Sequence, residues 1–191
     1  MWSRYLRPSV SLILAMTWLL GGAYPLMVTG VSQLVFRSQA DGSLIKKGGV
    51  LVGSALIGQN FTGSEYFWGR PSATTPQPYN GIASGGSNLG PLNPALLDRV
   101  NANAKLLRDA DPSNSAPIPV ELVTSSASGL DPDISPAGAQ YQAARVARAR
   151  HAPLAVIQAL IARHQRGPLL GILGETQINV LELNLALDQQ T

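Results

Sequence analysis

The chain has 191 residues, of which 14 are lysine or arginine, 11 are aspartate or glutamate and none is cysteine. The lack of cysteine excludes a disulfide framework, a Cys-ligated zinc site and a thiol nucleophile. Charged residues make up 13% and hydrophobic residues 45% of the chain, a composition too apolar for a disordered protein and too poor in charge for an ordinary cytosolic one.

The net charge of +3 arises at the N-terminus. Arg4, Arg7 and Arg37 flank an uncharged run over 8–36, and the remaining 11 basic residues are balanced by 11 acidic ones. The rest of the chain has no net positive charge with which to neutralise phosphates, so we expect no nucleic-acid binding.

The uncharged run is long enough to cross a membrane, because a bilayer core about 30 Å thick needs roughly 20 residues of helix. Gly21–Gly22–Ala23 could instead be the cleavage site of a signal peptide. However, the run continues 13 residues beyond Ala23, which favours a retained anchor. Pro25 predicts a kink in the outer half of this helix.

Because Arg4 and Arg7 precede the span, the positive-inside rule places the N-terminus in the cytoplasm and the bulk of the chain outside it. The predicted organisation is a tail and transmembrane helix over 1–37 and one mixed α/β extracytoplasmic domain over 38–191. The fold class is therefore α+β, with a single N-terminal transmembrane helix.

Beyond the anchor, the segment LIKKGGVLVGSALIGQNF (44–61) predicts two strands joined by a tight turn at Gly48–Gly49. A long loop follows over 69–94, which is dense in Pro, Gly, Ser and Asn. A loop of this length in a compact domain is typically functional or mobile.

Two helices are predicted where a capping residue precedes proline, at Asn93–Pro94 and at Ser135–Pro136. A third helix restarts after Pro153 and stops before Gly167–Pro168. The sequence also predicts strands at 120–126 and 169–175, and a final helix over 179–188 for which a strand is the alternative.

Sequence motifs for nucleotide binding and for hydrolase catalysis are incomplete in this chain. GGVLVGSA (48–55) has the glycine spacing of a phosphate-binding loop, but Ser54–Ala55 stands where that loop needs Lys followed by Ser or Thr. The histidines, His151 and His164, are expected at the surface, and no Gly-x-Ser-x-Gly elbow accompanies them. We predict no catalytic residues and no metal site, although a membrane-anchored or secreted hydrolase stays open as the alternative.

Two segments are candidates for binding. Tyr66, Phe67 and Trp68 stand beside Arg70; they either anchor the loop to the core or form a partner-binding surface, since exposed aromatics and arginine are common interface anchors. The turn at Ser128–Gly129 is rich in hydroxyls and amides that can bind an anion.

A cluster of arginines marks the helix that follows Ser135–Pro136. Arg145, Arg148 and Arg150 lie close together on it. Such a group is more typical of a solvated helix face than of a phosphate site.

With these residues in place, the sequence resembles the C subunit of the Kdp potassium-transporting ATPase. The resemblance covers nearly the whole chain behind the N-terminal span. The matching stretches, in order, are GSALIGQNF, YFWGRPSA, SGGSNLGPLNP, VTSSASGLDPDISPAGAQYQAARVARAR and LGETQINVLELNLALD.

This resemblance implies an accessory subunit of a bacterial inner-membrane complex for high-affinity potassium uptake, needed for assembly and activity. The implied partners are a channel-like potassium-binding subunit, a P-type ATPase subunit and a small peptide subunit. ATP and potassium would be handled by the complex, with no cofactor bound by this chain alone. The family also carries a catalytic-chaperone role that raises ATP affinity, whose nucleotide contact would fall at Ser128 and Gly129.

Overall fold

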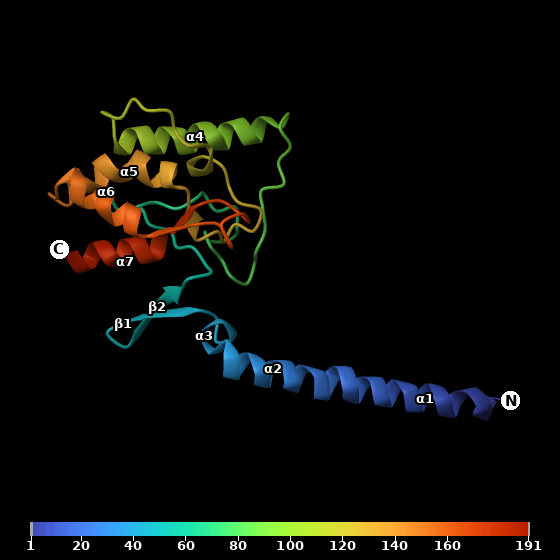
Figure 1. The fold of residues 1–191 in the computed structure, drawn as a ribbon. Coiled ribbons are helices and arrows are strands. Elements are labelled where there is room, and N and C mark those ends of the chain that lie inside the picture. Colours follow the sequence, from blue (N-terminus) through green and yellow to red (C-terminus); the bar gives the residue numbers. More distant parts are fainter. Residues whose placement is uncertain (1, 191) are drawn as a thin grey trace. The chain divides into compact units, whose positions relative to one another are not determined.

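The computed structural model describes residues 2–190 and, within them, the side chains from Arg4 onward (Figure 1). It shows a mixed helix and sheet structure, which confirms the predicted α+β class. By its internal contacts the chain divides into two units, Met1–Val52 and Gly53–Thr191.

The N-terminal unit is dominated by a continuous apolar helical segment, Arg4–Val35, of 32 residues, in which an 18-residue window reaches a mean hydropathy of 1.6. By length and composition it can span a membrane. Its elements are α1 (Trp2–Trp18), the π-helical turn η1 (Leu19–Ala23) and α2 (Tyr24–Val35), followed by α3 (Arg37–Ala40), β1 (Leu44–Lys47) and the first residues of β2 (Val50–Ser54), which crosses the boundary between the units.

The predicted disturbance near Pro25 takes the form of the π-helical turn η1. The backbone N–H of Tyr24 donates to the carbonyl of Leu19, five residues back, where an α-helix would bond four residues back. Because Pro25 has no N–H, the helix cannot continue its regular bonding through this position, and the wider turn accommodates the missing donor.

The predicted hairpin is confirmed. β1 and β2 form a two-stranded sheet, and the two residues between them, Gly48 and Gly49, have φ of 59° and 83°. A two-residue turn with both central residues left-handed matches the twist of the flanking strands, and only glycine adopts it without a steric cost.

The second unit contains four longer helices and a small antiparallel sheet of order β3-β5-β4. In the register, Ile178 of β5 lies opposite Ile134 of β3 and Gln165 of β4. The elements are α4 (Pro94–Ala110), the 3₁₀ turn η2 (Val120–Leu122), β3 (Asp133–Ile134), α5 (Pro136–Ala149), α6 (Leu154–Arg163), β4 (Gln165–Arg166), β5 (Gln177–Asn179) and α7 (Val180–Gln190).

The predicted helix starts are confirmed by their capping bonds. The side chain of Asn93 accepts a hydrogen bond of 3.0 Å from the backbone N–H of Ala95, and that of Ser135 accepts one of 3.1 Å from Gly138. In both cases proline follows the cap, where its missing N–H costs nothing. The third helix is α6 and the final helix is α7, so the strand alternative for 179–188 is wrong.

The core lies where α6 packs against α5 and α7 (Figure 1). Aliphatic side chains from the three helices and the sheet meet there, and each is at most 2% exposed: Ile134, Val146, Ile157, Ile161, Ile178, Leu183 and Leu187. Burying such side chains supplies roughly 1.5–3 kcal/mol each, which is the main stabilisation of the unit.

Two strand predictions are wrong. Residues 120–126 begin with the 3₁₀ turn η2. Both the N–H and the hydroxyl of Thr124 donate to the carbonyl of Val120, and these local bonds close a turn in place of pairing with another strand. Residues 169–175 contain only an isolated bridge between Leu169 and Leu173, since glycines with positive φ at 171 and 174 bend the segment into a tight turn.

Candidate functional site

The aromatic segment 65–70 is an irregular part of the second unit. Two buried side-chain amides hold its backbone. Asn184 on α7 accepts from the N–H of Phe67 at 2.9 Å and donates to its carbonyl at 3.0 Å. Gln142 on α5 makes the same pair of bonds to Trp68, at 2.8 and 3.0 Å. Each amide thus takes the place of a neighbouring strand.

Arg145 on α5 fixes the start of the same segment. It is 4% exposed, and its guanidinium donates to the carbonyls of Ser64 (2.6 Å) and Tyr66 (3.0 Å) while lying 4.4 Å from the centroid of the Trp68 ring. Burial lowers the pKa of Arg145 to about 10, so the side chain still carries its charge at neutral pH. The contact with the ring is therefore a cation–π interaction.

Arg150 extends this arrangement. Its Nε donates to the carbonyl of Glu65 at 2.7 Å, its guanidinium pairs with Asp188 at 2.8 Å, and it lies 5.0 Å from the centroid of the Tyr66 ring. The predicted solvated arginine face is thus wrong for Arg145 and Arg150. A loop remote in sequence covers them and supplies the carbonyl acceptors that burial of a guanidinium requires.

Arg148 is the one of the three arginines that points outward. Its side chain is 55% exposed and pairs with the buried carboxylate of Asp111.

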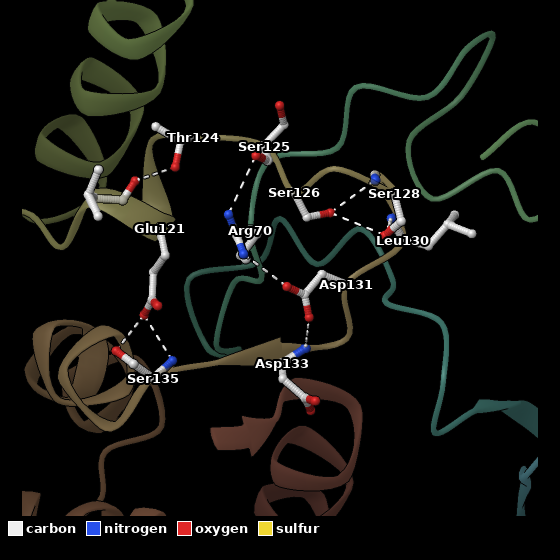
Figure 2. Close-up of polar contacts among 12 residues, drawn as sticks. Arg70, Glu121, Thr124, Ser125, Ser126, Ser128, Leu130, Asp131, Asp133 and Ser135 are labelled. Atoms are coloured by element: carbon white, nitrogen blue, oxygen red, sulfur yellow. Dashed lines mark hydrogen bonds and ion pairs between the residues drawn. The ribbon is translucent and has the colours of Figure 1, made fainter. Parts of the chain in front are cut away.

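The four predicted partner-binding residues therefore have different surroundings. Phe67 is fully buried in the core, which fits the anchoring alternative and leaves its side chain inaccessible to a partner. Tyr66, Trp68 and Arg70 are partly exposed. Arg70 pairs with Asp131 at 3.0 Å and donates to the carbonyl of Ser125 at 3.4 Å, as Figure 2 shows. Its charge is already balanced within the chain.

The turn at Ser128–Gly129 also uses its own donors. The N–H of Gly129 donates to the hydroxyl of Ser126 at 2.9 Å, and the N–H of Leu130 donates to the hydroxyl of Ser128 at 3.1 Å (Figure 2). Gly129 has φ of 67°, and a Cβ there would lie 2.7 Å from the carbonyl oxygen of Gly85. The amides that would bind an anion are satisfied by serine hydroxyls, and the glycine is required by close packing.

A cleft of about 380 Å³ lies beside the aromatic segment, and its lining includes Trp68, Arg70, Tyr79 and Asn103. The hydroxyl of Tyr79 donates to the carbonyl of Arg70. Burial, assisted by the negative charge of Asp131, raises the pKa of Tyr79 to about 12, so this phenol stays protonated. It stabilises the loop and does not supply a base.

The two histidines lie apart from this cleft. His151 is exposed just after α5 with φ of 52°, and Nδ1 of His164 lies 2.9 Å from the carbonyl of Leu160 in its own helix. In the described part of the chain, no group of three or more His, Cys, Asp or Glu side chains could hold a metal ion.

Sequence reasoning missed Gln142 and Asn184, the two residues that position the aromatic segment. Both are 1% exposed; Asn184 lies among buried leucines of α7, whereas Gln142 lies beside the buried Arg145 and accepts a hydrogen bond from it at 2.8 Å. A lone amide on a core-facing stripe is the signal that could have identified Asn184, because a buried amide requires partners; Gln142 has no such signal, since arginine shares its helix face.

An apolar N-terminal helix long enough to span a membrane, joined to an α+β unit, defines a membrane-associated protein. The family model described as "KdpC: K+-transporting ATPase, c chain" matches residues 6–189. The chain belongs to this family.

Curated relatives are similar to this chain over nearly their whole length. The chain is 62% identical over 183 residues to the "Potassium-transporting ATPase KdpC subunit" of Variovorax paradoxus (strain S110), covering 96% of this chain and 95% of the relative. The identically named protein of Polaromonas naphthalenivorans (strain CJ2) is also 62% identical, with coverages of 96% and 93%. That of Sorangium cellulosum (strain So ce56) is 58% identical, with coverages of 96% and 97%.

Proposed function

We propose that this protein is the accessory C subunit of an ATP-driven potassium uptake complex, required for assembly and activity and without a catalytic site of its own. The observation that carries the proposal is the family match over residues 6–189, together with relatives of the same length that are named as subunits of a potassium-transporting ATPase.

The proposed partners are a channel-like potassium-binding subunit, a P-type ATPase subunit and a small peptide subunit. The helix Arg4–Val35 would anchor the chain among them in the bacterial inner membrane. With Arg4 and Arg7 retained in the cytoplasm, residues 38–191 lie on the periplasmic side. The exposed edges of Tyr66, Trp68 and Arg70 are the proposed partner contacts.

The proposed orientation bears on the catalytic-chaperone role. It separates the Ser128–Gly129 turn from cytosolic ATP. A nucleotide at this turn would also have to break two hydrogen bonds, in which backbone N–H groups donate to serine hydroxyls. We therefore assign ATP binding to the ATPase subunit and a structural role to this turn. Photolabelling of the whole complex with an azido-ATP analogue tests this: label on the P-type subunit alone is expected, and label on this chain would refute the assignment.

Growth of a bacterial strain that lacks this chain, on limiting potassium, tests the proposed function. The full chain should restore growth, whereas residues 1–37 alone should not. Immunoblots should show the other subunits in the membrane in both cases, as the control for their insertion. Growth restored by residues 1–37 would contradict a required role for the folded unit. A His151→Ala, His164→Ala double variant should restore growth fully, since the hydrolase alternative needs a histidine base.

The absence of cysteine makes the orientation easy to map. A single cysteine introduced as Ser115→Cys, in an exposed loop, should react with a membrane-impermeant maleimide in intact spheroplasts, whereas one placed ahead of Arg4 should react only after lysis. The reverse pattern would place the folded unit in the cytoplasm and return the nucleotide role to consideration.

A further inference from the structure

The most exposed apolar cluster of the second unit is a tight turn between β4 and β5. Four aliphatic side chains project from it: Leu169, Leu170, Ile172 and Leu173, which are 68%, 83%, 80% and 58% exposed. We call these four residues the aliphatic tip. Contiguous exposed apolar groups of this kind mark a surface that is covered in the working protein.

We propose that the aliphatic tip inserts into the interfacial layer of the lipid bilayer that holds the chain's own N-terminal helix. The inference rests on the membrane anchorage contained in the proposed function. It assigns to the folded unit a second, shallow membrane contact in addition to the anchor.

Four backbone donors of the tip are bonded within the turn. The N–H of Leu169 donates to the carbonyl of Leu173 at 2.8 Å, and that of Leu173 donates back to Leu169 at 3.0 Å. The N–H groups of Gly171 and Ile172 are likewise bonded within the turn, and Pro168 has none. Lipid supplies no partners to backbone donors, so these four internal bonds favour a shallow insertion of the tip.

The side chain at the apex is held at a conformational cost. Leu170 has φ of 55°, a left-handed conformation that a bulky residue rarely adopts and that glycine or asparagine would adopt more easily. Strain of this kind at an exposed position, where no packing inside the protein rewards the leucine, points to a role of the side chain outside the folded unit.

The chemistry of the tip favours lipid over a protein partner. Protein interfaces are enriched in aromatic residues and arginine, whereas residues 167–174 contain only glycine, proline, leucine and isoleucine. The flanking charges, Arg166 and Glu175, stand at the base of the turn, where they can stay in the headgroup region.

The anchor keeps the tip within reach of the membrane. The apolar helix ends at Val35 and the second unit begins at Gly53. Even a fully extended connection of 17 residues spans only about 60 Å, so the tip is held at a high effective concentration next to the bilayer.

The cysteine-free chain allows a direct test by fluorescence. The variant Ile172→Cys, labelled with the environment-sensitive dye NBD, is reconstituted as the full chain into vesicles of phosphatidylethanolamine and phosphatidylglycerol. We expect a blue-shifted emission and quenching by lipids that carry a nitroxide close to the headgroup. The matched control is Val120→Cys, an aliphatic residue of similar exposure, 72%, outside the tip; its label should show neither effect.

A second variant tests the role of the apex. Adding Leu170→Asn to the labelled chain replaces the leucine with a polar residue that tolerates positive φ, so the turn is kept while its insertion is weakened. Loss of quenching is expected. Quenching that is unchanged by Leu170→Asn would overturn the proposal.

Two other outcomes would also overturn it. A water-like emission at Ile172→Cys without quenching, while a label at Val28→Cys in the anchor is quenched, refutes tip insertion and leaves the anchorage intact. A blue shift that occurs only when the other subunits are present, without nitroxide quenching, identifies a protein contact instead. Absence of quenching at Val28→Cys would count against the anchorage in the proposed function.

Discussion

Replacing Arg145 by methionine tests how the aromatic segment is held. Methionine keeps most of the side-chain length but removes every donor and the charge. The carbonyls of Ser64 and Tyr66 lose bonds of 2.6 and 3.0 Å, at about 1–3 kcal/mol for each acceptor left without a partner. Loss of the cation–π contact with Trp68, 4.4 Å from guanidinium to ring centroid, adds about 1–2 kcal/mol.

Part of this loss is offset, because the buried guanidinium is itself unfavourable, as the lowered pKa of Arg145 indicates. We therefore expect Arg145→Met to destabilise the folded unit by about 3 kcal/mol, which corresponds to a fall in Tm of about 10 °C for a unit of this size. The stability of Arg145→Lys should lie between that of the parent and that of Arg145→Met, since one ammonium cannot make all the hydrogen bonds that the planar guanidinium makes.

Thermal unfolding of the full chain in detergent, followed by near-UV circular dichroism and tryptophan fluorescence, measures these changes. Arg99→Met, at an exposed position on α4, is the matched control and should stay within about 0.5 kcal/mol of the parent. If Arg145→Met unfolds at the same temperature as Arg99→Met, the guanidinium contacts contribute no net stability and the reasoning fails.

Three further predictions concern stability in the same assay. Asn184→Ala should cost about 2–5 kcal/mol, because it leaves the N–H and carbonyl of the buried Phe67 without partners; a change below 1 kcal/mol would show that water replaces the amide. Gly129→Ala should destabilise the fold by more than about 2 kcal/mol, since the φ of Gly129 is 67° and a Cβ would lie 2.7 Å from a backbone oxygen. The control Gly85→Ala should be close to neutral, because a Cβ at Gly85 has no atom within 4 Å. Equal effects of the two substitutions would refute the packing explanation. Burial, together with a neighbouring carboxylate, raises the pKa of Asp133, so the charged form of Asp133 destabilises the fold at neutral pH. Asp133→Asn should therefore be more stable than the parent at pH 7. The difference in free energy of unfolding should shrink as the pH falls through the raised pKa of Asp133, because the parent carboxyl then takes up its proton. A difference that grows on acidification would contradict this sign.

The sequence by itself determined the features that depend on neighbours along the chain. The apolar N-terminal helix of membrane-spanning length follows from an uncharged run over 8–36, the hairpin turn from Gly48–Gly49, and two helix starts from the cap-and-proline pairs at Asn93 and Ser135. Each rests on a local rule: hydrophobic length, positive φ or an N-terminal donor that needs an acceptor. The family resemblance, carried by long stretches in order, likewise needed no structure.

Only the tertiary structure decided where the polar side chains are used. The sequence predicted a solvated face for Arg145 and Arg150, because the loop that covers them lies about 80 residues earlier. The periodicity of α5 contains no information about that loop. The same holds for Gln142 and Asn184, whose bonds to the aromatic segment span 74 and 117 residues. A guanidinium or amide is compatible with either water or a buried carbonyl, and only the folded chain determines which of the two it meets.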